Sequence, residues 1–199
     1  MNIMASIAID IALIPPQEVI NKAIEINQQL LKNNEKKLVL GKKKTLPHIT
    51  LFMGCIEEKI FSEVRESVNK VAVQFHPLDL QVTGITTDEN GYSSLKIAMT
   101  DELHLLHNVI IKKMVDYSGF HVPTDAFYKL SEADSLSAYY VENYRVKSSF
   151  QNYFPHITLG YGQTEYNDLP ITFTASRLAG CHLGTQCTCQ KILFEFELK

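Results

Sequence analysis

The chain has 199 residues, of which 45% are hydrophobic and 21% are charged, so it can bury a sizeable core. This composition excludes a disordered tail and a minimal disulfide scaffold. The 19 Lys and Arg residues are balanced by 22 Asp and Glu residues, which gives a net charge of −3 at pH 7. A protein with this balance has no global positive field to hold long duplex nucleic acid. Any nucleic-acid substrate would have to be small or terminal and bound in a pocket.

The first predicted element is a strand over residues 3–14. Its odd positions are all apolar, whereas its even positions include Ser6 and Asp10, and this period of two is typical of a strand with one core face. The segment is too short for a membrane span, and no Lys or Arg precedes it as in a signal peptide. Because the chain also has four cysteines and no N-glycosylation sequon, the sequence predicts a cytoplasmic protein that does not engage a membrane.

The rest of the chain alternates between helical and strand patterns. The predicted helices begin after Pro16, near Glu57, after Asp101 and, as a short one, near Ser131. Two hairpins are predicted, one from residues 78–87 and 92–99 around a turn at 88–91, the other from residues 171–181 and 185–198. No Gly/Ser linker separates the halves, so residues 1–199 are predicted to form one α+β domain.

A short motif occurs twice. Residues 47–54 (PHITLFMG) and 155–162 (PHITLGYG) are identical at six of eight positions, and their histidines are 108 residues apart. Each copy follows a predicted strand and helix, so the order strand, helix, motif strand is repeated. This repeat predicts two related lobes.

The motif places a chemically useful pair on one face of each strand. Alternation directs His48 and Thr50 to one side, and His156 and Thr158 likewise, while the intervening aliphatic residues point to a core. If a pseudo-twofold axis relates the lobes, both faces meet across one cleft. Two histidines can then divide the proton transfers of a displacement at phosphorus, and threonine hydroxyls can donate to phosphoryl oxygens.

The two H-x-T motifs resemble those of the two-histidine (2H) phosphoesterase superfamily, which includes bacterial 2′-5′ RNA ligases, also called RNA 2′,3′-cyclic phosphodiesterases. The resemblance implies a bilobal duplicated α+β domain, with two mainly antiparallel sheets and outer helices around a central cleft, and no metal or other cofactor. It implies that His48 and His156 are the acid and base, in an order left open, and that Thr50 and Thr158 bind the phosphate. The implied reaction is hydrolysis of a 2′,3′-cyclic phosphate or a related small ribonucleotide diester. Alternatives are 2′-5′ RNA ligation, cleavage of 2′-5′ oligoadenylate or cyclic oligonucleotides, and nucleotide or RNA binding without catalysis.

Residues next to the motifs are candidates for substrate binding. Cations can meet phosphates and aromatic rings can stack on bases. These candidates are Lys42, Lys44, Tyr144, Arg145, Tyr153 and Phe154. The expected partner is a small nucleotide, a cyclic phosphate or an RNA end, bound by a monomer.

Two other patterns are weaker. Cys181, His182, Cys187 and Cys189 could suggest a metal site, but the C-x-C spacing lacks the loop of a zinc knuckle. Strand alternation instead predicts that Cys187 and Cys189 lie on one face as small apolar residues. The remaining histidines have no matched partner and are expected to be exposed or locally bonded.

Overall fold

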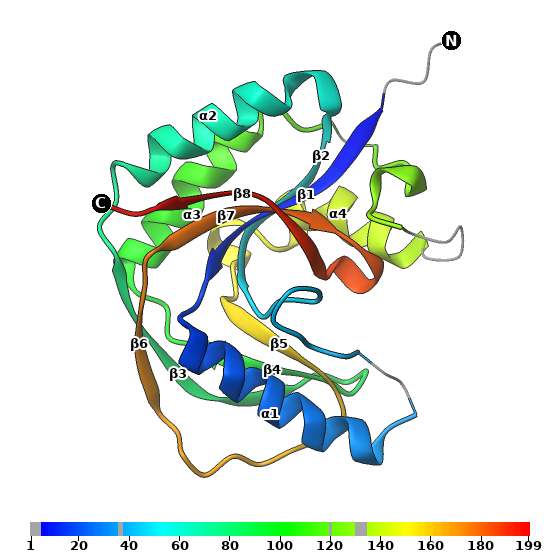
Figure 1. Ribbon diagram of the computed structural model, residues 1–199, viewed down its shortest axis with the longest axis vertical. Helices are drawn as coiled ribbons and strands as arrows, with labels where there is room; N and C mark the ends of the chain where they lie inside the picture. Colours follow the sequence, from blue (N-terminus) through cyan, green and yellow to red (C-terminus); the bar gives the residue numbers. More distant parts are fainter. Residues whose placement is uncertain (1–4, 36–37, 120, 130–134) are drawn as a thin grey trace.

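Two four-stranded antiparallel sheets form the framework of the protein, seen in a computed structural model that describes residues 5–35, 38–119, 121–129 and 135–199 (Figure 1). In sheet A the spatial order is β2 (Ile49–Glu57), β1 (Ser6–Ile14), β7 (Arg177–Leu183) and β8 (Cys189–Glu197). In sheet B the order is β5 (His156–Tyr161), β4 (Tyr92–Ile97), β3 (Leu78–Thr87) and β6 (Ile171–Ala175). Each motif strand is therefore the edge strand of a sheet.

Two of the described helices, the first and the third, begin where the sequence provides a start signal. Pro16 stands at the N-cap of the first helix, and Thr100 caps the third by accepting a hydrogen bond from the Leu103 amide at 3.1 Å. The described residues form α1 (Gln17–Asn33), α2 (Phe61–Ala72), α3 (Asp101–Met114) and α4 (Ser135–Lys147). Four single 3₁₀ turns are η1 (Glu58–Ile60), η2 (Thr124–Ala126), η3 (Phe150–Asn152) and η4 (Thr185–Cys187). Among the described residues, no helix is long and apolar enough to cross a membrane.

The two halves of the chain exchange helices. Helix α1 follows β1 of sheet A but packs on β5 of sheet B, and α3 follows β4 of sheet B but packs on β2 of sheet A. Figure 1 shows α1 against sheet B, with α2 and α3 at the opposite end beside sheet A. Apolar residues of both helices join one buried cluster with the strands of both sheets. This exchange joins the two halves through a common core.

Both motif strands carry a β-bulge at the same place. The consecutive residues Ala12 and Ile11 of β1 pair with Thr50 and Phe52 of β2, so Leu51 is the extra residue. The consecutive residues Ser94 and Ser93 of β4 pair with Thr158 and Gly160 of β5, so Leu159 is the extra residue. A bulge leaves its extra residue out of the ladder and re-aims neighbouring side chains. The repeat seen in the sequence thus extends to backbone irregularities.

The predicted α+β class and paired antiparallel sheets are confirmed, as is the hairpin of β3 and β4. The predicted strand over residues 171–181 is wrong. The chain passes from sheet B to sheet A at Ser176, so β6 pairs with β3 while β7 pairs with β1 and β8. No proline or glycine marks this transfer. The residues predicted to cap the fourth helix, 131–134, lie outside the described part of the chain.

Candidate active site

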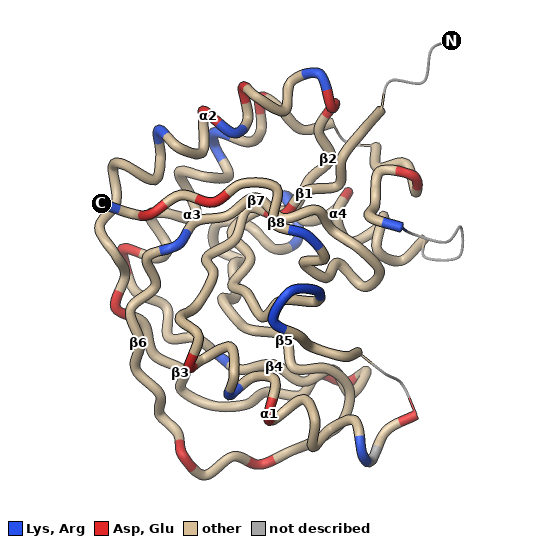
Figure 2. Tube along the Cα trace, in the orientation of Figure 1, with Lys and Arg blue, Asp and Glu red and all other residues tan. Residues whose placement is uncertain are grey.

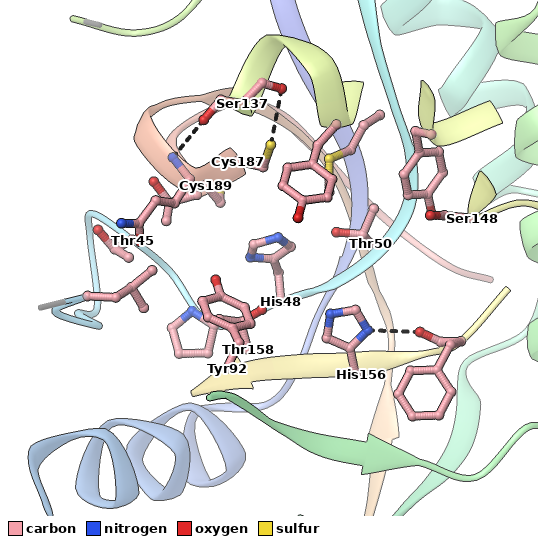
Figure 3. A pocket seen from close by; sticks show the side chains of 18 of the residues that line it. Thr45, His48, Thr50, Tyr92, Ser137, Ser148, His156, Thr158, Cys187 and Cys189 are labelled. Atoms are coloured by element: carbon pink, nitrogen blue, oxygen red, sulfur yellow. Dashed lines mark hydrogen bonds between the residues drawn. The ribbon is translucent and has the colours of Figure 1, made fainter. Parts of the chain in front are cut away.

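Both motif histidines line one cavity of about 620 Å³. His48 immediately precedes β2 and His156 is the first residue of β5, so they come from different sheets. Figure 3 shows the two imidazoles directed into the same space. The volume lies within the range of pockets that bind small molecules. The structure therefore brings the two distant histidines together.

The Nδ1 atoms of the two histidines have the same kind of partner. His48 Nδ1 donates to the carbonyl oxygen of Leu46 at 2.6 Å, and His156 Nδ1 donates to that of Phe154 at 2.8 Å. In each case the carbonyl lies two residues before the histidine. A carbonyl only accepts, so this bond places a proton on Nδ1 and fixes the tautomer of the neutral ring. In both rings, Nε2 is the nitrogen that this backbone bond does not engage.

The Nε2 atoms differ in their surroundings. His48 Nε2 lies 3.1 Å from Oδ2 of Asp10, a fully buried residue in the middle of β1. The same Oδ2 accepts a hydrogen bond from the Thr50 hydroxyl at 2.7 Å. Among the described residues, Asp10 Oδ1 has no hydrogen-bond partner. The negative charge of Asp10 is therefore compensated through one oxygen, by His48 and Thr50.

Thr158 has a neutral partner. Its hydroxyl shares a side-chain hydrogen bond with Tyr92 of β4, and both residues line the cavity (Figure 3). Burial raises the pKa of Tyr92 above its ordinary value, and the hydrogen bond with Thr158 offsets this only in part, so the phenol stays neutral at physiological pH. The two threonines predicted to bind phosphate thus both line the cavity, and each is hydrogen-bonded to a residue of the neighbouring strand.

These surroundings shift the two imidazoles in opposite directions. Burial lowers the pKa of His48, but its hydrogen bond to Asp10 and the charge of that carboxylate outweigh the burial and raise the pKa from 6.5 to about 9. Burial lowers the pKa of His156 below 6.5, the bond to the Phe154 carbonyl opposes this, the charge of His48 lowers the pKa further, and the charge of Asp10 is the smallest opposing effect. At neutral pH, His48 is therefore an imidazolium and His156 a neutral imidazole.

Only some of the predicted substrate-binding residues reach the cavity. Tyr144 and Tyr153 line it but are buried in the core, whereas Phe154 is 48% exposed beside the ring of His156. Arg145 is half-buried and is not part of the lining. Lys42 and Lys44 are exposed in a loop, and neither lysine lines the cavity. Figure 2 shows this loop next to the gap between the sheets.

The cysteine cluster is arranged differently from the strand prediction. Cys187 ends the turn η4 and Cys189 begins β8, so they do not share a strand face, although both line the cavity. Cys187 Sγ donates to the Ser137 carbonyl, and His182 Nε2 donates to the Ala126 carbonyl. Among the described residues, no three His, Cys, Asp or Glu side chains are grouped so that they could hold a metal ion.

Sequence reasoning missed Asp10 as a member of the site. It was assigned only to the polar face of its strand. The available signal was a lone carboxylate within an otherwise apolar strand, which becomes costly once the strand is buried on both sides. Tyr92 was missed because a tyrosine at a strand end is common. Both were identified only from the pairing of β1 with β2 and of β4 with β5.

Comparison with solved structures shows the same fold in other proteins. A Thermus thermophilus protein, TT0787, superposes with a TM-score of 0.63 at 14% identity, covering 96% of this chain and 98% of that one. Escherichia coli LigT superposes with TM-scores of 0.61 at 12% identity, in a complex with NADP+, and 0.57 at 13% identity, in a complex with 3′-AMP. In both cases 98% of this chain and 99% of LigT are covered.

Sequence comparison agrees with the fold. No curated protein sequence gives a significant match. The family model described as the 2′-5′ RNA ligase superfamily matches residues 29–178, which include both motifs. The chain belongs to the 2′-5′ RNA ligase superfamily and has the 2H phosphoesterase fold.

Proposed function

We propose that this protein is a metal-independent phosphodiesterase that hydrolyses 2′,3′-cyclic phosphates or related small ribonucleotide diesters. The observation that carries the proposal is that His48 and His156, on matched edge strands of two sheets, line one cavity with their Nδ1 atoms bound in the same way. Structural packing alone does not require two imidazoles in this arrangement. Membership of the superfamily and the phosphoesterase-type fold support the same class of reaction.

Paired imidazoles supply both proton transfers that hydrolysis requires. One imidazole takes a proton from water as the water oxygen attacks phosphorus. The bond from phosphorus to a ribose oxygen then breaks, and the other imidazole protonates that oxygen. The products are a ribose hydroxyl and a phosphate monoester. Thr158 can donate to a non-bridging oxygen while it accepts from the Tyr92 phenol, because a hydroxyl both donates and accepts.

The charge of the cavity favours a small substrate with one negative charge. The described lining residues include no Lys or Arg, and they include the carboxylate of Asp88. A strand of RNA with several phosphates would need several cations along its path. The lining also includes exposed aromatic and apolar side chains, namely Leu136, Tyr140 and Phe154. A nucleoside 2′,3′-cyclic phosphate has one negative charge and a flat base whose faces can stack on aromatic rings, and LigT, of the same fold, forms a complex with the mononucleotide 3′-AMP.

A substrate panel in the presence of EDTA tests the proposal. We expect turnover of nucleoside 2′,3′-cyclic phosphates to monoesters, followed by ³¹P NMR, and slower or no turnover of 2′-5′-linked oligoadenylates and cyclic dinucleotides. Joining of cyclic-phosphate and 5′-hydroxyl RNA ends without hydrolysis would establish a ligase instead. Nucleotide binding without turnover of any panel member would reject catalysis, and loss of turnover on chelation would reject metal independence.

A further inference from the structure

We propose that Asp10 is a positioning residue that sets the direction of proton transfer, holding His48 as the general acid and leaving His156 as the general base. The inference rests on the proposed function for its catalytic meaning. It assigns the two roles that the repeated motif, being the same in both halves, leaves undetermined. Its basis is a position beside the histidines at which the two halves differ.

The difference is located by the matched β-bulges. Ala12 pairs with Thr50 and Asp10 with Met53 on sheet A, while Ser94 pairs with Thr158 and Tyr92 with Tyr161 on sheet B. Met53 and Tyr161 each lie five residues after the motif histidine. Asp10 and Tyr92 therefore occupy the same position in the two halves, and each bonds to its motif threonine. One half has a carboxylate there and the other a phenol.

The difference between a carboxylate and a phenol at this position changes what each histidine can do. A buried carboxylate needs a cation, and His48 Nε2 is 3.1 Å from Asp10 Oδ2. With Nδ1 bound to the Leu46 carbonyl, both ring nitrogens of His48 face acceptors, which favours the doubly protonated ring. His156 Nδ1 bonds to the Phe154 carbonyl, and the phenol of Tyr92, which lines the same cavity, has no charge. His156 Nε2 thus keeps its lone pair.

The threonines follow the same asymmetry. A carboxylate only accepts, so Asp10 holds the proton of the Thr50 hydroxyl. The phenol of Tyr92 can donate, which frees the Thr158 proton for a phosphoryl oxygen. Thr50 accordingly orients Asp10 toward His48, and Thr158 is the phosphate donor. The two copies of one motif are thereby given different tasks by residues outside the motif.

Other titratable groups also face this pair. His48 is faced by the Cys189 thiol of β8 and by His156 of β5, besides Asp10. Asp10 is faced by the hydroxyls of Tyr144 in α4 and of Tyr153, which precedes β5, and by the Cys181 thiol of β7. Burial raises the pKa of both tyrosines, and the hydrogen bond with Cys189, together with burial, raises that of Cys181. Asp10 is therefore the anion that stabilises the His48 cation.

The proton transfers of the hydrolysis step balance. His156 Nε2 gains the proton of the attacking water, and His48 Nε2 loses its proton to the ribose oxygen that leaves phosphorus. After turnover His156 is cationic and His48 neutral. Exchange with solvent restores the starting state, and Asp10 favours reprotonation of His48 rather than of His156. The step as written needs no oxidant, reductant or covalent intermediate.

The test is an NMR titration of the two imidazoles in the wild type and in Asp10→Asn. The amide is nearly isosteric and its oxygen can still accept from Thr50, so the fold is expected to persist. In the wild type, His48 should titrate near pH 9 and His156 below 6.5. In Asp10→Asn, His48 should titrate more than one pH unit lower, and the alkaline limb of kcat/KM should move with it.

Asp79→Asn is the matched control. Asp79 Oδ1 accepts from the hydroxyl of Thr174 at 2.7 Å, across two strands of sheet B and away from the main cavity, so its loss should leave both titrations unchanged. If His156 titrates above His48 in the wild type, or if His48 does not shift in Asp10→Asn, the proposal is wrong. The wild-type titration decides even if Asp10→Asn does not fold. Because titration needs no substrate, an inactive protein with the expected shifts would reject the proposed function but not the effect of Asp10 on the charge of His48.

Discussion

Asn27 and His107 each hydrogen-bond one copy of the motif, and they do so at equivalent backbone carbonyls. Asn27 Nδ2, from α1, donates to the carbonyl oxygen of Leu159 at 2.7 Å, and His107 Nδ1, from α3, donates to that of Leu51 at 2.9 Å. Leu51 and Leu159 are the bulge residues, whose carbonyls lie where the ladder is interrupted. Each helix thus bonds the motif strand of the opposite half.

The same two side chains also bind the segment that precedes the other motif. Asn27 donates to the Leu38 carbonyl and accepts from the Leu40 amide, before His48. His107 Nε2 accepts from the amide of Phe150, before His156. The ring of His107 further stacks on Tyr153, with centroids 3.7 Å apart. Asn27 and His107 are both buried. Each therefore links the bulge of one motif strand to the segment that precedes the motif of the other half.

Replacing Asn27 should destabilise the protein. Asn27→Ala leaves two carbonyls and one amide buried without their side-chain partner, and such losses cost about 1–3 kcal/mol each, so we expect a total loss of at least about 3 kcal/mol. Urea unfolding measures it. Asn21→Ala, on the exposed side of the same helix, should change the free energy of unfolding by less than about 0.5 kcal/mol. Equal effects of both substitutions would show that the buried bonds contribute nothing specific.

His107 should make the fold sensitive to acid. Burial lowers the pKa of His107 from 6.5 to about 4, against the opposing effect of the bond to Leu51. Between these values the unfolded chain binds a proton that the folded chain does not, so stability falls as pH falls from about 6.5 to 4, by on the order of 2 kcal/mol. His107→Gln cannot titrate. Its free energy of unfolding should therefore fall less than that of the wild type between pH 7 and 4.5, and equal slopes would contradict the assignment.

Removal of either motif histidine should reduce turnover of a nucleoside 2′,3′-cyclic phosphate. General acid and general base catalysis each contribute about 10²–10⁴-fold, so His48→Ala and His156→Ala should lower kcat/KM by at least that factor. His121→Ala is the control, because His121 is exposed and pairs with Glu142 at the surface. His48→Ala should also lower the melting temperature, since it leaves Asp10 buried without its cation. Near-normal turnover in both motif variants would reject the site.

The pH dependence of kcat/KM should be bell-shaped and asymmetric about neutrality. Activity requires neutral His156, so it should fall in acid with a midpoint below 6.5. Activity also requires protonated His48, so it should fall in alkali with a midpoint near 9. The initial rate at low substrate concentration, measured from pH 5 to 10, gives both limbs. A flat profile over this range would be incompatible with the proposed histidine pair.

The repeated motif predicts that His48 and His156 meet at one cleft, and both line one cavity in the structure. Matching strand positions for His48 and His156 carry information that a single histidine does not, and period-two alternation predicts which side chains share a face. The substrate-binding candidates were predicted less well. Proximity to a motif along the chain placed Lys42 and Arg145 among them, although neither lines the cavity. Neighbours in sequence share a cavity only when the backbone between them turns the side chains toward it.

By itself, the sequence determined the α+β class, the order of most elements, and the repeat with its matched histidines, because hydrophobic periodicity and repetition are local properties of the chain. Tertiary structure alone decided that α1 and α3 pack on each other's motif strand and that the chain changes sheets at Ser176. It alone paired Asp10 with His48. The physical reason is that strand pairing and burial join residues far apart in sequence, and the charge that a buried imidazole carries depends on the groups packed against it.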